Sequence, residues 1–194
     1  MKIAAVDGPA FFIRTAYLQH VDPAAILPGT EFTEDDEEDI LNAGLCYAAE
    51  SKAIDYLSRA EQSRFGLTRK LSSKGMQKQY ITSALDYLEN KKYLSDARYA
   101  CAWLNSRKAT HHEGRIRLAA ELCSRGIDRH TADEALTAFF EENSEEEECR
   151  KAAEKCVRLG MSCEKAAKFL SLHGFTAKMI AVESTLFENS DKKK

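Results

Sequence analysis

The chain has 194 residues, of which 44% are hydrophobic and 30% charged, with a formal net charge of −3. This composition can form a packed core, and no apolar run approaches the roughly 20 residues that a membrane helix needs. The N-terminal stretch MKIAAVDG lacks a hydrophobic signal core, so we expect a cytoplasmic protein.

Charge is distributed unevenly along the chain. Residues 1–39 carry two basic and nine acidic side chains, a net of −7, whereas residues 58–129 carry fifteen Lys and Arg against seven Asp and Glu, a net of +8. A basic middle of this kind can contact an anionic partner even when the whole chain is slightly acidic.

The first 33 residues differ from the rest and form an N-terminal extension. Residues 3–6 and 11–13 read as two short strands around the turn Asp7-Gly8-Pro9, which predicts a hairpin. A lone hairpin is only marginally stable, so it must pack against a helix or stay partly mobile.

An acidic run, Glu34–Asp39, follows the extension directly. Thr33 is a suitable N-cap, and acidic residues favour the first turn of a helix because of the helix dipole. The alternative reading is that the run mimics nucleic-acid phosphate.

From residue 34 to near the C-terminus the pattern predicts helices only, hence an all-α fold. We expect a leading helix near 34–42, followed by helices near 45–61, 63–73, 76–90, 95–108, 113–124, 129–142, 144–159, 162–172 and 175–188. They group into the segment 34–94, which holds the leading helix and the first three-helix repeat, and the segments 95–143 and 144–190, which hold the second and third repeats, with a fraying tail at 191–194.

This grouping depends on an internal repeat. Gly75, Gly126 and Gly174 are 51 and 48 residues apart, each preceded four residues earlier by a leucine and followed by a bulky apolar residue. We therefore predict three tandem three-helix repeats in an elongated, curved array, with Leu71, Leu122 and Leu170 buried. Stacked helical arrays are usually binding surfaces.

The sequence shows no enzyme signature. It contains no glycine-rich phosphate loop, GxSxG or HExxH motif, so we expect no catalysis, cofactor or small-molecule substrate. Cys149, Cys156 and Cys163 favour core packing over a metal site, because no histidine or fourth thiol lies at a ligand spacing. The adjacent His111 and His112 read as solvated imidazoles in a loop, since neighbouring residues chelate poorly.

Clustered basic residues are the best candidates for partner binding. The set comprises Arg59, Arg64, Arg69 and Lys70 in the first repeat and Arg107, Arg115 and Arg117 in the second. Arg64 and Arg115 each lie eleven residues before the repeat glycine, near a helix start, where the dipole disfavours a cation. A phosphate or an acidic partner would explain them, and a plain solvated face is the alternative.

The segment 56–64, YLSRAEQSR, and the segment 67–75, LTRKLSSKG, resemble the YLxRRExS and ELxxKLxxKG patterns of the RecX family, the regulators of the RecA recombinase. Residues 84–100, ALDYLENKKYLSDARYA, are similar to LxxLxxxGYLDDxRYA, and residues 114–127, GRIRLAAELCSRGI, to GPxRIxxELxxKGI. In the third repeat the resemblance consists mainly of the repeat period, Gly174 and the spacing of apolar residues.

The resemblance implies a non-catalytic protein of three tandem three-helix repeats. It implies binding in the groove of the RecA–DNA filament, suppression of the RecA ATPase and strand exchange, and weak contact with DNA. On this basis we expect Arg64, Arg69, Arg115 and Arg117 to carry much of the filament affinity while contributing little to folding. A stand-alone nucleic-acid-binding module and a helical scaffold for an unrelated protein are the competing readings.

Overall fold

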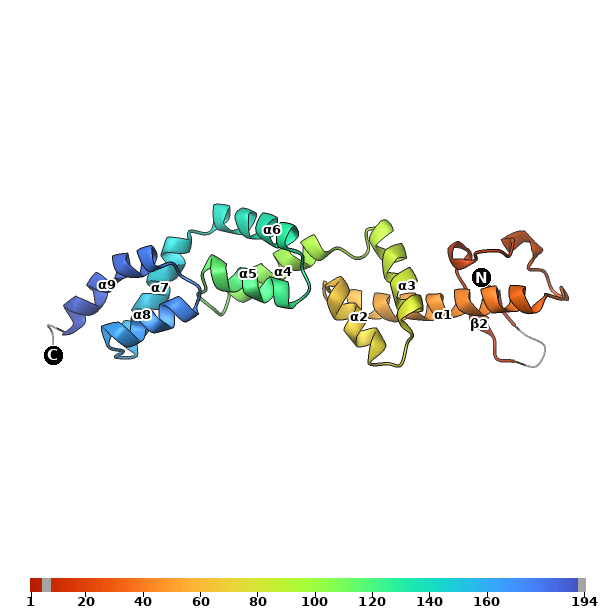
Figure 1. Cartoon of the computed structure of the whole chain (residues 1–194), viewed down its shortest axis with the longest axis horizontal. Helices are drawn as coiled ribbons and strands as arrows, with labels where there is room; N and C mark the ends of the chain where they lie inside the picture. The colour runs from red at the N-terminus through yellow and green to blue at the C-terminus, as the bar shows by residue number, and fades with distance from the viewer. Residues whose placement is uncertain (5–7, 192–194) are drawn as a thin grey trace. The chain divides into compact units, whose positions relative to one another are not determined.

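A computed structural model of the chain describes residues 1–4 and 8–191, with side chains described to Ser184. The chain divides into two compact units, Met1–Ser95 and Asp96–Lys194 (Figure 1). Part of the first predicted strand and most of the predicted tail lie outside the described residues.

The N-terminal extension forms the predicted hairpin, with shorter strands. β1 (Lys2–Ile3) pairs antiparallel with β2 (Phe11–Phe12), and two short 3-10 helices follow, η1 (Thr15–Tyr17) and η2 (Pro23–Ala25). Ile13 and Tyr17 are buried against Ala43 and Cys46 of the next helix. The hairpin therefore packs on a helix, as a two-stranded ribbon requires.

The leading helix and the first helix of the first repeat are one continuous helix, α1 (Glu34–Leu57). The predicted break between residues 42 and 45 was wrong. Gly44 lies in the middle of this helix, where glycine costs about 1 kcal/mol relative to alanine. The absence of a side chain there leaves room for the Phe11 ring of the hairpin, since a Cβ at Gly44 would lie 2.7 Å from that ring.

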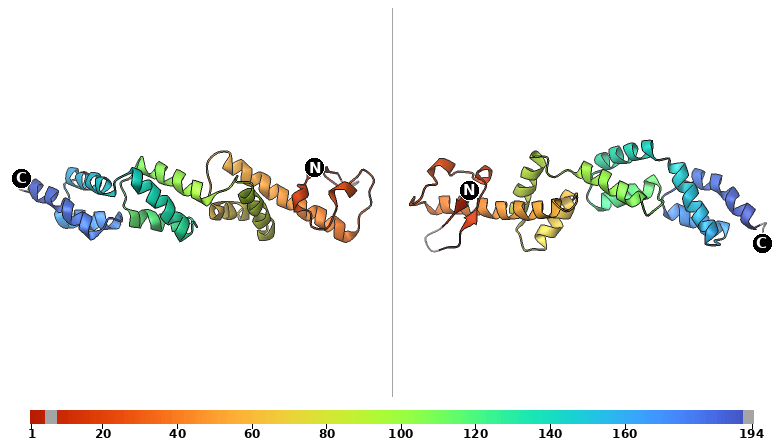
Figure 2. Two further views of the ribbon diagram at one scale, coloured as in Figure 1. Left: turned by 90° about the horizontal axis from the view of Figure 1, so that it is seen from above. Right: turned by 180° about the vertical axis from the view of Figure 1, so that it is seen from behind.

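The remaining helices of the described residues begin within two residues of their predicted starts. They are α2 (Arg64–Ser72), α3 (Lys78–Asn90), α4 (Asp96–Lys108), α5 (Arg115–Ser124), α6 (Arg129–Glu142), α7 (Glu145–Arg158), α8 (Cys163–Leu172) and α9 (Ala177–Asp191). The third helix of each triplet packs against the other two, α3 on α1 and α2, α6 on α4 and α5, and α9 on α7 and α8 (Figure 2). Each triplet has its own apolar cluster.

The repeat glycines terminate the second helix of each triplet. Gly75, Gly126 and Gly174 have φ values of +80°, +80° and +86°, a conformation that glycine adopts without strain. In each turn the glycine N–H bonds back three residues, and the next N–H bonds the carbonyl of the preceding leucine. This is the Schellman motif, which also brings that leucine against the apolar residue after the glycine. Leu71, Leu122 and Leu170 are fully buried, as predicted.

Candidate partner-binding surface and internal cation network

The candidate basic residues are distributed over both units. Arg59 follows α1, Arg64, Arg69 and Lys70 belong to α2, Arg107 to α4, and Arg115 and Arg117 to α5. The structure separates them into residues that bind carboxylates within the fold and residues that face solvent.

Arg64 connects the second and third helices of the first repeat. Its guanidinium lies 2.5 Å from Glu89 Oε2 and 2.6 Å from Asp86 Oδ1, both on α3. Arg115, at the equivalent position of the second repeat, lies 3.0 Å from Asp133 Oδ1 and donates to Thr137 Oγ1 at 2.9 Å on α6. Internal acceptors thus account for a cation at each helix start, where the sequence pattern alone leaves a partner and a solvated face as alternatives.

Arg107 and Arg117 hold a buried carboxylate, Glu113, in the loop before α5. Arg107 Nε lies 2.6 Å from Glu113 Oε2 and Arg117 Nε lies 2.6 Å from Oε1, while the Glu113 side chain is only 2% exposed. Burial alone would raise the pKa of Glu113, but hydrogen bonds and charge from the two arginines outweigh it and hold that pKa below its ordinary value. The sequence pattern did not single out Glu113, because its two partners come from different helices.

The solvent-facing cations lie in the connection between α1 and α2 and in the last turn of α2. Arg69 lies over the ring of Phe65 at 5.8 Å, and Lys70 lies over Tyr56 at 5.0 Å. Lys70 also donates to the Gln62 side chain at 2.6 Å, and Arg59 is exposed in the connection itself. We call Arg59, Arg69, Lys70, Tyr56 and Phe65 the α2 basic surface.

Cation–aromatic contacts of this kind contribute about 0.5–1 kcal/mol at exposed sites and leave the charge available to a partner. The Phe65 ring is 44% exposed. The α2 basic surface therefore offers charge together with apolar area.

The acidic run at the start of α1 has structural roles. Thr33 and Asp36 form a capping box, and buried Asp39 accepts the backbone N–H groups of Gln19, His20 and Val21 at 2.9–3.0 Å. Burial would raise the pKa of Asp39, yet these donors keep it below its ordinary value. The helix-start interpretation thus accounts for the run, and nothing in these contacts favours phosphate mimicry.

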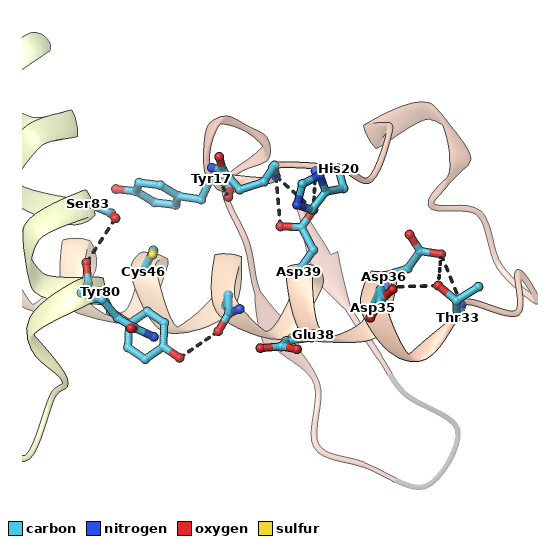
Figure 3. Close-up of a pocket in the computed structure, with 13 residues that line it drawn as sticks. Tyr17, His20, Thr33, Asp35, Asp36, Glu38, Asp39, Cys46, Tyr80 and Ser83 are labelled. Carbon is cyan, nitrogen blue, oxygen red and sulfur yellow. Dashed lines mark hydrogen bonds between the residues drawn. The ribbon is translucent and has the colours of Figure 1, made fainter.

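A groove of about 880 Å³ lies between α1, the segment after η1, and α3 (Figure 3). Its lining is mainly polar, and several of its groups already have internal partners. Tyr80 donates to Asn42 Oδ1 at 2.8 Å, and Asp39 binds the backbone as described.

The histidine and cysteine hypotheses have different outcomes. His111 is exposed, as predicted, but His112 is not simply solvated, because its Nδ1 lies 2.7 Å from Glu148 Oε2 on α7. Cys149 and Cys156 are buried in the core of the third repeat, and Cys163 is exposed at the start of the next helix. Among the described side chains, residues 1–4 and 8–184, no group of three His, Cys, Asp or Glu could hold a metal ion. Over the same residues, no helix is long and apolar enough to cross a membrane.

Repeated three-helix units with an exposed basic and aromatic surface define a tandem helical-repeat protein, a class that commonly presents binding surfaces. Residues 49–88 match the description "RecX, first three-helix domain", and residues 95–136 match "RecX, second three-helix domain".

Curated relatives extend this match over most of the chain. "Regulatory protein RecX" of Treponema pallidum strain Nichols is 32% identical over 152 residues, which cover 78% of this chain and 93% of the relative. The protein of the same title from Pseudomonas fluorescens is 34% identical over 137 residues, covering 69% and 88%. The chain therefore belongs to the RecX family of regulatory proteins.

Solved structures show the same fold. A crystal structure titled as regulatory protein RecX aligns with a TM-score of 0.74 at 23% identity, covering 82% of this chain and 81% of that chain. The crystal structure of RecX from Lactobacillus salivarius aligns with a TM-score of 0.64 at 22% identity, covering 75% and 97%.

Proposed function

We propose that this protein binds the RecA–DNA filament and modulates, mainly inhibits, its ATPase and strand-exchange activity. Membership of a family of regulatory proteins carries the proposal, because relatives with that title match most of the chain. The protein acts by binding, in the cytoplasm, without a catalytic step or cofactor of its own.

The α2 basic surface is the proposed contact in the first unit. Arg69 and Lys70 stand beside aromatic rings, and Lys70 also beside an amide, and Arg59 is exposed. In contrast, Arg64, Arg107, Arg115 and Arg117 bind internal carboxylates. Guanidinium and ammonium groups suit acidic protein side chains and phosphates alike. We therefore assign filament contact first to Arg59, Arg69 and Lys70, and an architectural contribution to the other four.

Single-stranded-DNA-dependent ATP hydrolysis by the cognate RecA tests this proposal. The triple variant Arg59→Gln, Arg69→Gln and Lys70→Gln should keep its helical circular dichroism and weaken suppression of the ATPase about tenfold or more, equivalent to about 1.4 kcal/mol.

A matched control removes the same number of positive charges outside the α2 basic surface. Arg129→Gln, Lys165→Gln and Lys168→Gln also remove three exposed cations, and this triple should inhibit like the parent. Equal inhibition by both triples would place the contact outside the α2 basic surface, and failure of the parent to inhibit would reject the function itself.

A stand-alone nucleic-acid-binding module is the second candidate, because exposed cations beside aromatic rings also suit single-stranded nucleic acid. If binding depends on phosphate contacts, the affinity for DNA falls steeply as the salt concentration rises, and binding needs no recombinase. A salt titration on DNA alone and on the RecA–DNA filament separates the two candidates.

A further inference from the structure

The second and third repeats meet where α8 ends and α5 begins. The Gly114 N–H donates to the carbonyl of His173 at 2.8 Å. Arg117 Nη1 donates to the carbonyl of Leu172 at 3.0 Å. The start of α5 thus provides hydrogen-bond donors, and the end of α8 provides backbone carbonyls that have no acceptor role within their own helix.

Two glycines make this approach possible. A Cβ on Gly114 would lie 2.4 Å from the carbonyl oxygen of Gly174, and a Cβ on Gly174 would lie 2.3 Å from the backbone nitrogen of Arg117. Both contacts are with backbone atoms, which cannot relieve a clash by changing rotamer as a side chain can. Gly75 has the same turn in the first repeat, but a Cβ there meets nothing within 4 Å. The tight contact at Gly174 is therefore not a requirement of the turn.

Further contacts join the same two repeats. Glu145, in the first turn of α7, accepts the backbone N–H of Arg115 at 2.7 Å. His112 lies 2.7 Å from the buried carboxylate of Glu148. Arg117 also binds Glu113, so one guanidinium links the loop before α5 to the end of α8.

We propose that Gly114, Gly174 and Arg117 form a rigid junction that locks the second and third repeats into one body. We call these residues the glycine junction. They are positioning residues, because they set the angle between the second and third repeats. Resting on the proposed function, the inference adds that filament suppression needs this fixed angle, because the second and third repeats can contact one filament together only when their relative geometry lets both engage.

Two native cysteines allow a direct test in the full chain. Cys123 and Cys163 are exposed and lie at the ends of α5 and α8 that are remote from the junction. With the third exposed cysteine removed by Cys101→Ser, spin labels on Cys123 and Cys163 report the distance across the junction by electron paramagnetic resonance. The parent should give a single narrow distance distribution.

Gly114→Ala is the main variant, because Gly114 has φ −83°, a conformation that alanine adopts without strain, so the added methyl group acts only through its close contacts with Gly174 and the Phe175 ring across the junction. It should broaden or shift the distance distribution. Gly75→Ala and Gly160→Ala are controls, since both strain a positive-φ turn but meet open space. Both should keep the parent distribution even where they lower the melting temperature.

A broad parent distribution overturns the inference, whatever the variants do. So does a Gly114→Ala distribution like that of the parent. In the ATPase assay, Gly114→Ala should weaken suppression about tenfold, and the glycine controls should not. A changed distance with unchanged suppression rejects the functional half alone. Lack of suppression by the parent rejects the proposed function and leaves the distance measurement intact.

Discussion

At the scale of single residues, one leucine in each repeat is buried at the end of the second helix. Leu71, Leu122 and Leu170 are each fully buried beside the Schellman turn that follows them. Their burial was predictable because the apolar spacing and the glycine both lie within one helical turn and its end.

Leu122→Ala should lower the free energy of unfolding by about 2–5 kcal/mol, because the substitution leaves a cavity in a closed core. Denaturant titration followed by circular dichroism measures the change. Leu172→Ala is the matched control, since Leu172 is 65% exposed, and it should change stability by no more than about 0.5 kcal/mol. A loss below about 1 kcal/mol for Leu122→Ala would contradict its place in the core.

Glu113 is a buried carboxylate held between the guanidinium groups of Arg107 and Arg117. Glu113→Gln should destabilise the protein by about 1–3 kcal/mol, because Arg107 and Arg117 would lose a charged acceptor. Glu121→Gln is the control. Glu121 pairs with Arg125 at 2.5 Å but is 31% exposed, so its loss should cost no more than about 1 kcal/mol.

The pH dependence follows from the same carboxylate. The pKa of Glu113 is lower in the folded chain than its ordinary value, so its contribution is complete above about pH 4.3, the unfolded pKa. The contribution is lost as the pH falls through the lower, folded pKa. Unfolding titrations between neutral pH and pH 3 should show a smaller acid loss in Glu113→Gln than in the parent, and identical profiles would contradict this assignment.

At the scale of helices, local signals determine most ends. Ser63 and Ser144 are N-caps whose side chains accept a backbone N–H, and glycine turns close the second helices. The misplaced break in α1 has a tertiary cause, because only packing shows that Gly44 makes room for Phe11.

Two serines in the third repeat test the energetics of capping. Ser144 accepts the N–H of Glu147 at 3.2 Å, whereas Ser162 occupies the same N-cap position without a side-chain hydrogen bond. Ser144→Ala should cost about 1 kcal/mol and Ser162→Ala a few tenths. Thermal unfolding measures both, and equal losses would show that the cap bond of Ser144 contributes nothing.

For the whole molecule, the repeat predicts an extended array. Each triplet has its own small core, which is what an array of separate repeats requires. The radius of gyration from small-angle scattering should exceed about 16 Å, the value for a compact globule of this length. A compact value would contradict the array.

The sequence by itself determined the all-helical repeat, most helix starts and the buried leucines, because caps, turns and apolar spacing act between residues close in the chain. Tertiary structure decided the partners of the arginines. Arg64 finds Asp86 and Glu89 across a turn, and Arg117 reaches Leu172 from another repeat. Such pairs depend on how helices cross, and a linear pattern of charges does not contain that geometry. For this reason the candidate cations were recognised as a set, whereas their division into internal links and an exposed basic surface required the fold.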